Sequence, residues 1–191
     1  MFYLYEKLTD MKKSLLFLAA AFYLGNSYAQ TAEEQKAWMA FMTPGQEQSM
    51  LAKSSGNWSE EIAMYSDPNS APMKAKATCT NEMILGGRYQ KSTSKGDMMG
   101  MPFEGMNIVG YDNARKVWVS SWIDNLGTSI TYSEGTYDSN KKALIFNGKM
   151  TEPSGKATDF KQVFTMIDDD HQKIEMFSMM DERILKSWKF Y

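Results

Sequence analysis

From Trp58 onward the chain alternates apolar and polar side chains with a period of two, in short segments separated by turn formers. Turn residues cluster at Asp67-Pro68-Asn69, at Gly86-Gly87 and at Asp138-Ser139-Asn140. Regularly spaced short strands with such turns predict a meander of antiparallel hairpins. The predicted strands are 58–65, 73–85, 88–95, 103–111, 117–124, 128–137, 143–151, 157–167, 173–180 and 183–191.

A meander of about ten strands favours closure into a barrel, because closure removes both exposed edges of the sheet. Helical segments do not alternate with the strands, so a parallel α/β sheet is not expected. We therefore predict a mostly β fold, an antiparallel up-and-down barrel preceded by a short helical segment. Gly56-Asn57-Trp58 opens the first strand. We expect Trp58 to plug one barrel end and Gly56 to let the incoming chain cross close beneath it.

The helical lead-in has two parts. Residues 31–41 place Trp38 and Phe41 on one apolar stripe, which predicts a helix. A second short helix follows, for which Thr43 is the candidate N-cap and Pro44 the candidate first residue.

The N-terminus has the pattern of a cleavable secretory signal. Lys12 and Lys13 precede an apolar stretch over 14–24, and Ser27-Tyr28-Ala29 supplies small residues at the cleavage positions. A stretch this short disfavours a membrane anchor that persists after cleavage. We predict a periplasmic or secreted protein with a signal peptide at 1–29 (1–10 being an over-extended start), a helical lead-in at 30–55 and a barrel domain at 56–191.

Charge and cysteine content exclude several classes of function. The chain has 21 basic and 23 acidic side chains and no basic run, so nucleic acid is not an expected partner. Cys79 is the single cysteine and shares its strand face with Ala75 and Ala77, which indicates a small core residue rather than a nucleophile. His171 is the single histidine, so a zinc site and a Ser-His-Asp triad are not expected. We predict no cofactor and no metal.

Two further clusters have simple explanations. The acidic run at 168–170 lacks the spaced ligands of a calcium loop and fits a solvated hairpin turn. Met98, Met99 and Met101 carry thioethers that suit Cu(I) but more often pack in apolar pockets. We expect 98–102 to form a flexible apolar loop over a barrel mouth.

One parity of each strand faces the inside of a barrel, and a ligand pocket is mostly apolar with a few orienting polar groups. Aromatic and polar residues in the middle of the chain fit that description. The candidate ligand-binding residues are Arg88, Tyr111, Trp122, Asp124, Tyr132 and Glu134. Simpler roles exist for each: core packing for the aromatics, solvent exposure for Glu134, a turn cap for Asp124, and for Arg88 a stack on Trp58.

Several runs, including Thr43-Pro44-Gly45-Gln46-Glu47 and Gly56-Asn57-Trp58, resemble the family catalogued as domain of unknown function 1579. The similar segments are 43–47, 50–52, 56–58, 83–89, 98–105, 110–113, 121–125 and 134–138. The resemblance runs from about Thr43 to the C-terminus. It implies an exported bacterial protein with a lipocalin-like β-barrel and no established activity. The family often has a His where this chain has Gln48, so any chemistry of that His is absent here.

Three functions remain open from the sequence. The first is a binding barrel for a small hydrophobic or amphipathic ligand. The second is a structural or protein-interaction barrel with a packed interior. The third is an enzyme that uses Asp124 or Glu134 as a general base, which requires a buried acid with a raised pKa.

Overall fold

The computed structural model describes residues 31–66, 70–178 and 184–191. The predicted signal peptide at 1–29 lies outside the described residues. Contacts divide the chain after Ala40, and the second unit, Phe41–Tyr191, contains helix α3 and all of the described strands. Helix α2 spans Ala32–Met42 and α3 spans Gln46–Ala52. Among the described residues, no helix is long and apolar enough to cross a membrane.

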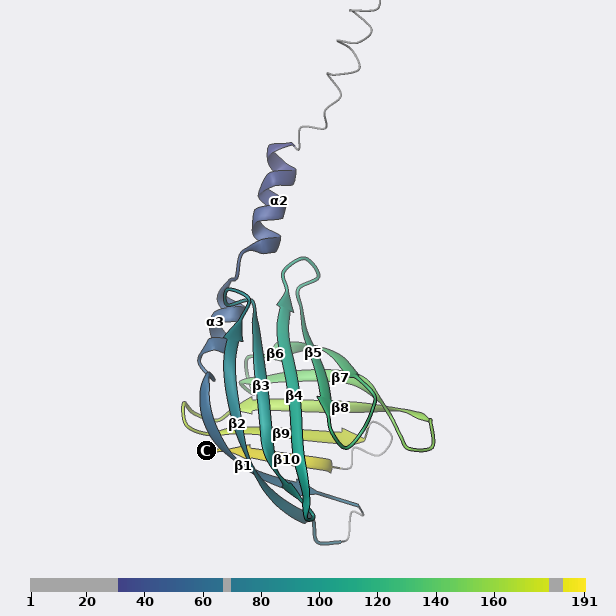
Figure 1. The fold of residues 1–191 in the computed structure, drawn as a ribbon. Coiled ribbons are helices and arrows are strands. Elements are labelled where there is room, and N and C mark those ends of the chain that lie inside the picture. The colour runs from purple at the N-terminus through teal and green to yellow at the C-terminus, as the bar shows by residue number, and fades with distance from the viewer. Residues whose placement is uncertain (1–30, 67–69, 179–183) are drawn as a thin grey trace, which may run out of the picture. The chain divides into compact units, whose positions relative to one another are not determined.

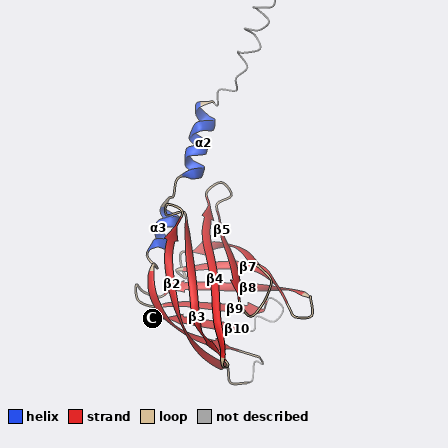
Figure 2. Ribbon diagram, viewed as in Figure 1, coloured by secondary structure: helices blue, strands red, loops and turns tan. Residues whose placement is uncertain are grey.

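Ten antiparallel strands follow one another around a closed barrel, and β1 pairs with β10 to close it (Figures 1 and 2). The prediction of a mostly β, up-and-down barrel with a helical lead-in is confirmed. The strands are β1 (Gly56–Met64), β2 (Met73–Ile84), β3 (Tyr89–Met98), β4 (Met101–Asp112), β5 (Val117–Asp124), β6 (Thr131–Asp138), β7 (Ala143–Thr151), β8 (Ala157–Met166), β9 (Gln172–Ser178) and β10 (Ile184–Phe190).

Strand alternation decides which side chains enter the barrel. On β1, Trp58, Glu60 and Ile62 are buried, whereas Ser59 and Glu61 between them are exposed. Successive side chains of a strand point to opposite faces, so the buried set marks the interior. Two apolar clusters take up part of that interior near β1. One contains Trp58, Cys79 and Phe190, and the other contains Ile62, Ala77, Met98 and Phe103.

Helix α3 lies beside β2 in Figure 2, and the packing of its side chains closes one end of the barrel. Leu51 is only 2% exposed and packs in a cluster with Val109, Trp118, Leu144 and Phe146. Side chains of β1, β2 and β3 donate hydrogen bonds to carbonyl groups at the C-terminal end of α3 and just after it, where the last carbonyls of a helix lack regular intrahelical partners.

Ser54 and Leu51 supply the acceptors for those bonds. Trp58 Nε1 donates to the Ser54 carbonyl at 3.0 Å, and Asn81 Nδ2 donates to the same oxygen at 2.9 Å. Gln90 Nε2 donates to the Leu51 carbonyl at 2.7 Å. Trp58 therefore lies at the end that α3 closes, and it fastens the helix there.

Three local expectations are wrong. The segment 98–102 is no loop, because β3 runs to Met98 and β4 starts at Met101. Positive φ angles of 59° at Met99 and 80° at Gly100 make a tight two-residue hairpin turn. Helix α3 begins later than predicted, with Gly45 as its N-cap. Gly56 has φ 137°, and a Cβ there would meet no heavy atom within 4 Å, so the residue serves backbone conformation rather than close approach.

Candidate functional site

A cavity of about 340 Å³ lies inside the barrel. Its lining runs from Leu51 of α3 at one end to Leu126 and Gly127, in the loop after β5, at the other. The volume falls in the range of about 300–1,000 Å³ that is typical of small-molecule pockets. Aromatic rings provide much of the apolar wall: Phe103, Trp122, Phe146, Phe160, Phe164 and Phe190.

Glu60 is a carboxylic acid buried in the wall of this cavity. Glu60 is only 3% exposed and lines the cavity. Ser94 Oγ donates a hydrogen bond to Glu60 Oε1 at 2.9 Å, and within the described part of the chain Oε2 has no partner. Burial raises the pKa of Glu60, although the hydrogen bond from Ser94 acts in the opposite direction. The site thus contains a carboxyl group whose pKa is raised by burial and whose second oxygen has no hydrogen-bond partner among the described residues.

The thiol of Cys79 lies beside Glu60 and is 2% exposed. Burial, and then the charge of Glu60, raises the pKa of Cys79 to about 12. The S–H group donates to Asn81 Oδ1 at 3.2 Å. Cys79 is therefore a neutral thiol at physiological pH, as expected for a core cysteine, and is a poor nucleophile.

Trp122 and Asp124 enter the cavity together from β5. Trp122 Nε1 donates to Asp124 Oδ2 at 2.7 Å, and the backbone N–H of Leu126 donates to Oδ1 at 2.9 Å. Asp124 thus caps the turn after β5 and also fixes the indole. The Trp122 ring stacks on Phe103 with centroids 6.3 Å apart. These contacts hold a rigid aromatic wall at the end of the cavity away from α3.

The remaining polar groups of the wall are neutral. Ser120 Oγ donates to Asn107 Oδ1 at 2.9 Å, and Ser133 lines the same side. Of the described residues that line the cavity, two are acidic, Glu60 and Asp124, and none is basic. The described part of the wall can therefore accept hydrogen bonds and compensate a positive charge, and none of its side chains offers a cation to an anionic group.

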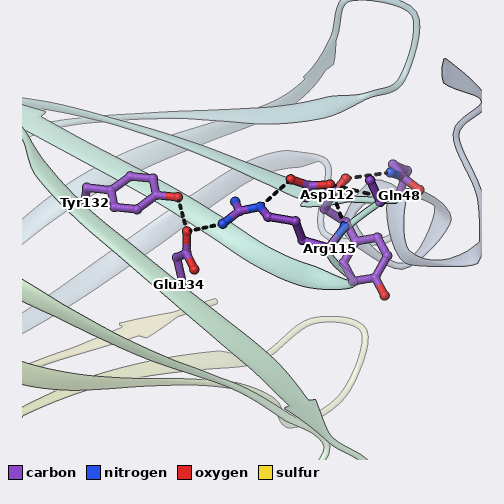
Figure 3. A network of polar contacts seen from close by, with 7 residues as sticks. Gln48, Asp112, Arg115, Tyr132 and Glu134 are labelled. Carbon is purple, nitrogen blue, oxygen red and sulfur yellow. Dashed lines mark hydrogen bonds and ion pairs between the residues drawn. The ribbon is translucent and has the colours of Figure 1, made fainter. Parts of the chain in front are cut away.

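Tyr132 and Glu134 point away from the cavity, on the outer face of β6 (Figure 3). Tyr132 donates to Glu134 Oε1 at 2.6 Å, and Arg115 Nη1 donates to the same oxygen at 2.7 Å. Arg115 Nε also donates to Asp112 Oδ2 at 2.7 Å. The hydrogen bonds from Tyr132 and Arg115 lower the pKa of Glu134, and those from Arg115 lower the pKa of Asp112. This network joins the turn after β4 to β6 on the outside.

Arg88 and Tyr111 lie near the end that α3 closes. Arg88 is exposed and donates to the carbonyls of Met42, at 2.7 Å, and Leu85, at 3.2 Å. Tyr111 packs against Trp118 with ring centroids 5.2 Å apart. Of the six candidate residues, the structure therefore brings Trp122 and Asp124 into the cavity wall, and it places Arg88, Tyr111, Tyr132 and Glu134 outside that wall.

Gln48, the residue for which the resemblance leads us to expect a His in the family, lies in α3. It is buried, accepts a hydrogen bond from the Gly45 N–H at 2.7 Å and donates to the Tyr111 carbonyl at 3.4 Å (Figure 3). The residue caps α3 and joins it to the barrel rim. His171 binds Asp168 at 2.8 Å in the turn after β8, where that hydrogen bond lowers the pKa of Asp168. In the described ranges, no three His, Cys, Asp or Glu side chains come together closely enough to hold a metal ion.

Sequence reasoning missed Glu60, the most deeply buried acid of the site. A signal for it exists in β1, because Glu60 has the same parity as Trp58 and Ile62. An acidic residue on the apolar parity of an amphipathic strand marks a charge that enters the barrel.

Comparison with known proteins identifies the family of the chain. No curated protein matches it. Among solved structures it is similar to a redesigned β-barrel, with 8% sequence identity and a TM-score of 0.38 over 73% of this chain and 91% of that one. The model of a protein family matches residues 43–187, the whole segment from the lead-in of α3 into β10. The chain therefore belongs to the family described as protein of unknown function DUF1579.

Proposed function

We propose that this protein is a binding barrel for a small hydrophobic or amphipathic molecule, which occupies the cavity between α3 and the loop after β5. The observation that carries the proposal is the cavity itself, about 340 Å³ lined by aromatic rings and a few oriented polar groups. A barrel whose purpose was only structural would gain stability by filling this volume, because internal cavities cost packing energy.

Binding of n-octanol tests the proposal, measured by isothermal titration calorimetry together with native mass spectrometry of the protein as purified. Ser120 faces the cavity and Ser121 has the opposite parity on the same strand. Ser120→Phe inserts a ring into the cavity, and Ser121→Phe adds the same ring outside. We expect the wild type and Ser121→Phe to bind n-octanol and Ser120→Phe to lose binding. A wild-type protein that binds none of n-octanol, n-octylamine and octanoate and carries no co-purified molecule would contradict the proposal.

The enzymatic alternative finds less support. Glu134 is a weak general base, because it is exposed and its pKa is lowered. Asp124 engages both of its oxygens, one with Trp122 and one with the backbone of Leu126. A general base needs a free oxygen that points toward its substrate.

We also propose export to the periplasm or the medium, on the signal-like pattern of residues 1–29. A binding barrel in that compartment would sequester or carry its molecule outside the cytoplasm. Fractionation of cells that express the full chain, with N-terminal sequencing of the exported form, tests this. Cleavage after Ala29 is the expected result.

A further inference from the structure

One oxygen of Glu60 is unexplained by the protein itself. Glu60 Oε1 is satisfied by Ser94, whereas Oε2 is the buried side-chain oxygen for which the described residues supply no partner. An unsatisfied buried polar atom costs stability, and such atoms in native proteins often mark a function. Trp58 and Ile62 on either side belong to separate apolar clusters, so Glu60 is a polar point in an otherwise apolar stretch of wall.

The charge of the lining restricts what Glu60 can bind. Glu60 and Asp124 are the acids among the described lining residues, and no described lining residue is basic. Against the described lining, a carboxylate or phosphate ligand would find no cation to compensate its negative charge, which is costly in an apolar site. A cation would meet a carboxyl group whose second oxygen has no hydrogen-bond partner among the described residues.

Small residues of the sheet connect Glu60 with the aromatic wall. Along the cross-strand row, Glu60 pairs with Ala77, Ala77 with Gly96, and Gly96 with Phe103. Ala77 and Gly96 are small, so no bulky side chain separates Glu60 from Phe103 and the stacked ring of Trp122. Aromatic faces attract ammonium groups, most strongly when the site is desolvated.

We propose that Glu60 anchors the ligand and that the class it selects is a small amphipathic amine, whose ammonium group donates to Glu60 while its apolar body lies against the aromatic wall. The inference rests on the proposed function, since it names the ligand class of the same cavity. An ammonium group has three donors and no acceptor, and it therefore suits a wall of carboxyl, hydroxyl and amide oxygens.

The pairing has a defined proton balance. Burial raises the pKa of Glu60, so the folded protein keeps the Glu60 proton to a higher pH than an exposed glutamate does. An ammonium ligand pairs with the carboxylate form, so at a pH below the pKa of Glu60 its binding releases the Glu60 proton to solvent. Of the described neighbours, Ser94 does not titrate and Cys79 stays protonated with its pKa at about 12. Affinity for an amine should therefore increase as pH rises through the pKa of Glu60.

The experiment titrates the intact protein with n-octylamine, n-octanol and octanoate by calorimetry at several pH values. We expect n-octylamine to bind most tightly, n-octanol more weakly and octanoate weakest. Hydrogen bonds to charged groups predict that Glu60→Gln weakens n-octylamine binding roughly tenfold to a hundredfold and changes n-octanol binding little. Glu61→Gln is the matched control, because it removes the same charge one residue along on the outer face.

The outcomes separate this inference from the proposed function. If n-octanol binds as tightly as n-octylamine, or if Glu60→Gln leaves n-octylamine affinity unchanged, the amine inference fails and the binding barrel stands. If amine affinity falls as pH rises through the acidic range, the ammonium–carboxylate pairing is also wrong. If none of the three probes binds, the proposed function itself fails. Circular dichroism of each variant verifies that the barrel has folded.

Discussion

The indole of Trp122 lies directly against Gly105 of the neighbouring strand. A Cβ atom at Gly105 would come within 2.5 Å of two carbons of the indole, Cζ2 and Cη2. The absence of a side chain at Gly105 therefore lets Trp122 lie along the wall, where it contacts Phe103 and bonds to Asp124.

Gly105→Ala should displace the indole. Overpacking of this kind costs about 1–3 kcal/mol of unfolding free energy. Urea denaturation measures the loss, and tryptophan fluorescence reports the changed environment of the ring. Gly127→Ala is the control, because a Cβ there meets its nearest heavy atom at 3.9 Å. Equal effects of the two substitutions would show that the contact with Trp122 is not the cause.

The raised pKa of Glu60 predicts a pH dependence of stability. The folded protein holds the Glu60 proton more tightly than the unfolded chain, in which the group titrates near 4.5. Stability should therefore fall as pH rises from 4.5 to the folded pKa, by up to about 1.4 kcal/mol per pH unit, and then level off.

Urea midpoints from acidic to neutral pH measure this slope. Glu60→Gln should flatten it, and Glu61→Gln should leave it as in the wild type. Stability that rises with pH in the wild type and in Glu60→Gln alike would show that other groups dominate the titration.

Cys79 should be inert in the folded protein. Its thiol is buried and its pKa is raised to about 12. At pH 8 a reagent therefore cannot reach the sulfur, and the thiol stays protonated. We expect Ellman's reagent to react with Cys79 only at the rate of unfolding, and at once in denaturant. Fast labelling of the native protein would indicate a barrel that opens readily near β2.

The outer network around Arg115 should matter little for binding. Glu134 lies on the outer face and its ion pair with Arg115 is exposed, so solvent screens their attraction. We expect Glu134→Gln to leave both the urea midpoint and n-octanol affinity close to those of the wild type. A clear loss of affinity would place Glu134 in the binding machinery after all.

The strands and their order were predictable because turn formers and alternation are local signals. Which residues of β6 point into the barrel was not predictable. Aromatic and charged residues at Tyr132 and Glu134 suggest a functional face, yet Thr131 and Ser133 are the residues that line the cavity. A strand beside a hollow interior needs small inward residues, which reverses the usual rule that large residues mark the inside.

The turn at Met99-Gly100 was also hidden from sequence reasoning. A methionine at positive φ is uncommon, and the hairpin forms because strand pairing continues to Met98 and Met101 on either side. For Glu60, by contrast, the sequence does contain a signal. Its parity was readable on β1, but an acid in a strand is normally taken to face water.

The seam between β1 and β10 has a kinetic consequence. Among the described strands, every other ladder joins neighbours in sequence, so those hairpins can form locally and early. The seam joins residues such as Glu60 and Phe190 across nearly the whole domain and should close last. Glu60 thus loses its water only at the final step of folding. Its ionisation should therefore act mainly on the unfolding rate, and the native barrel should open faster as pH rises.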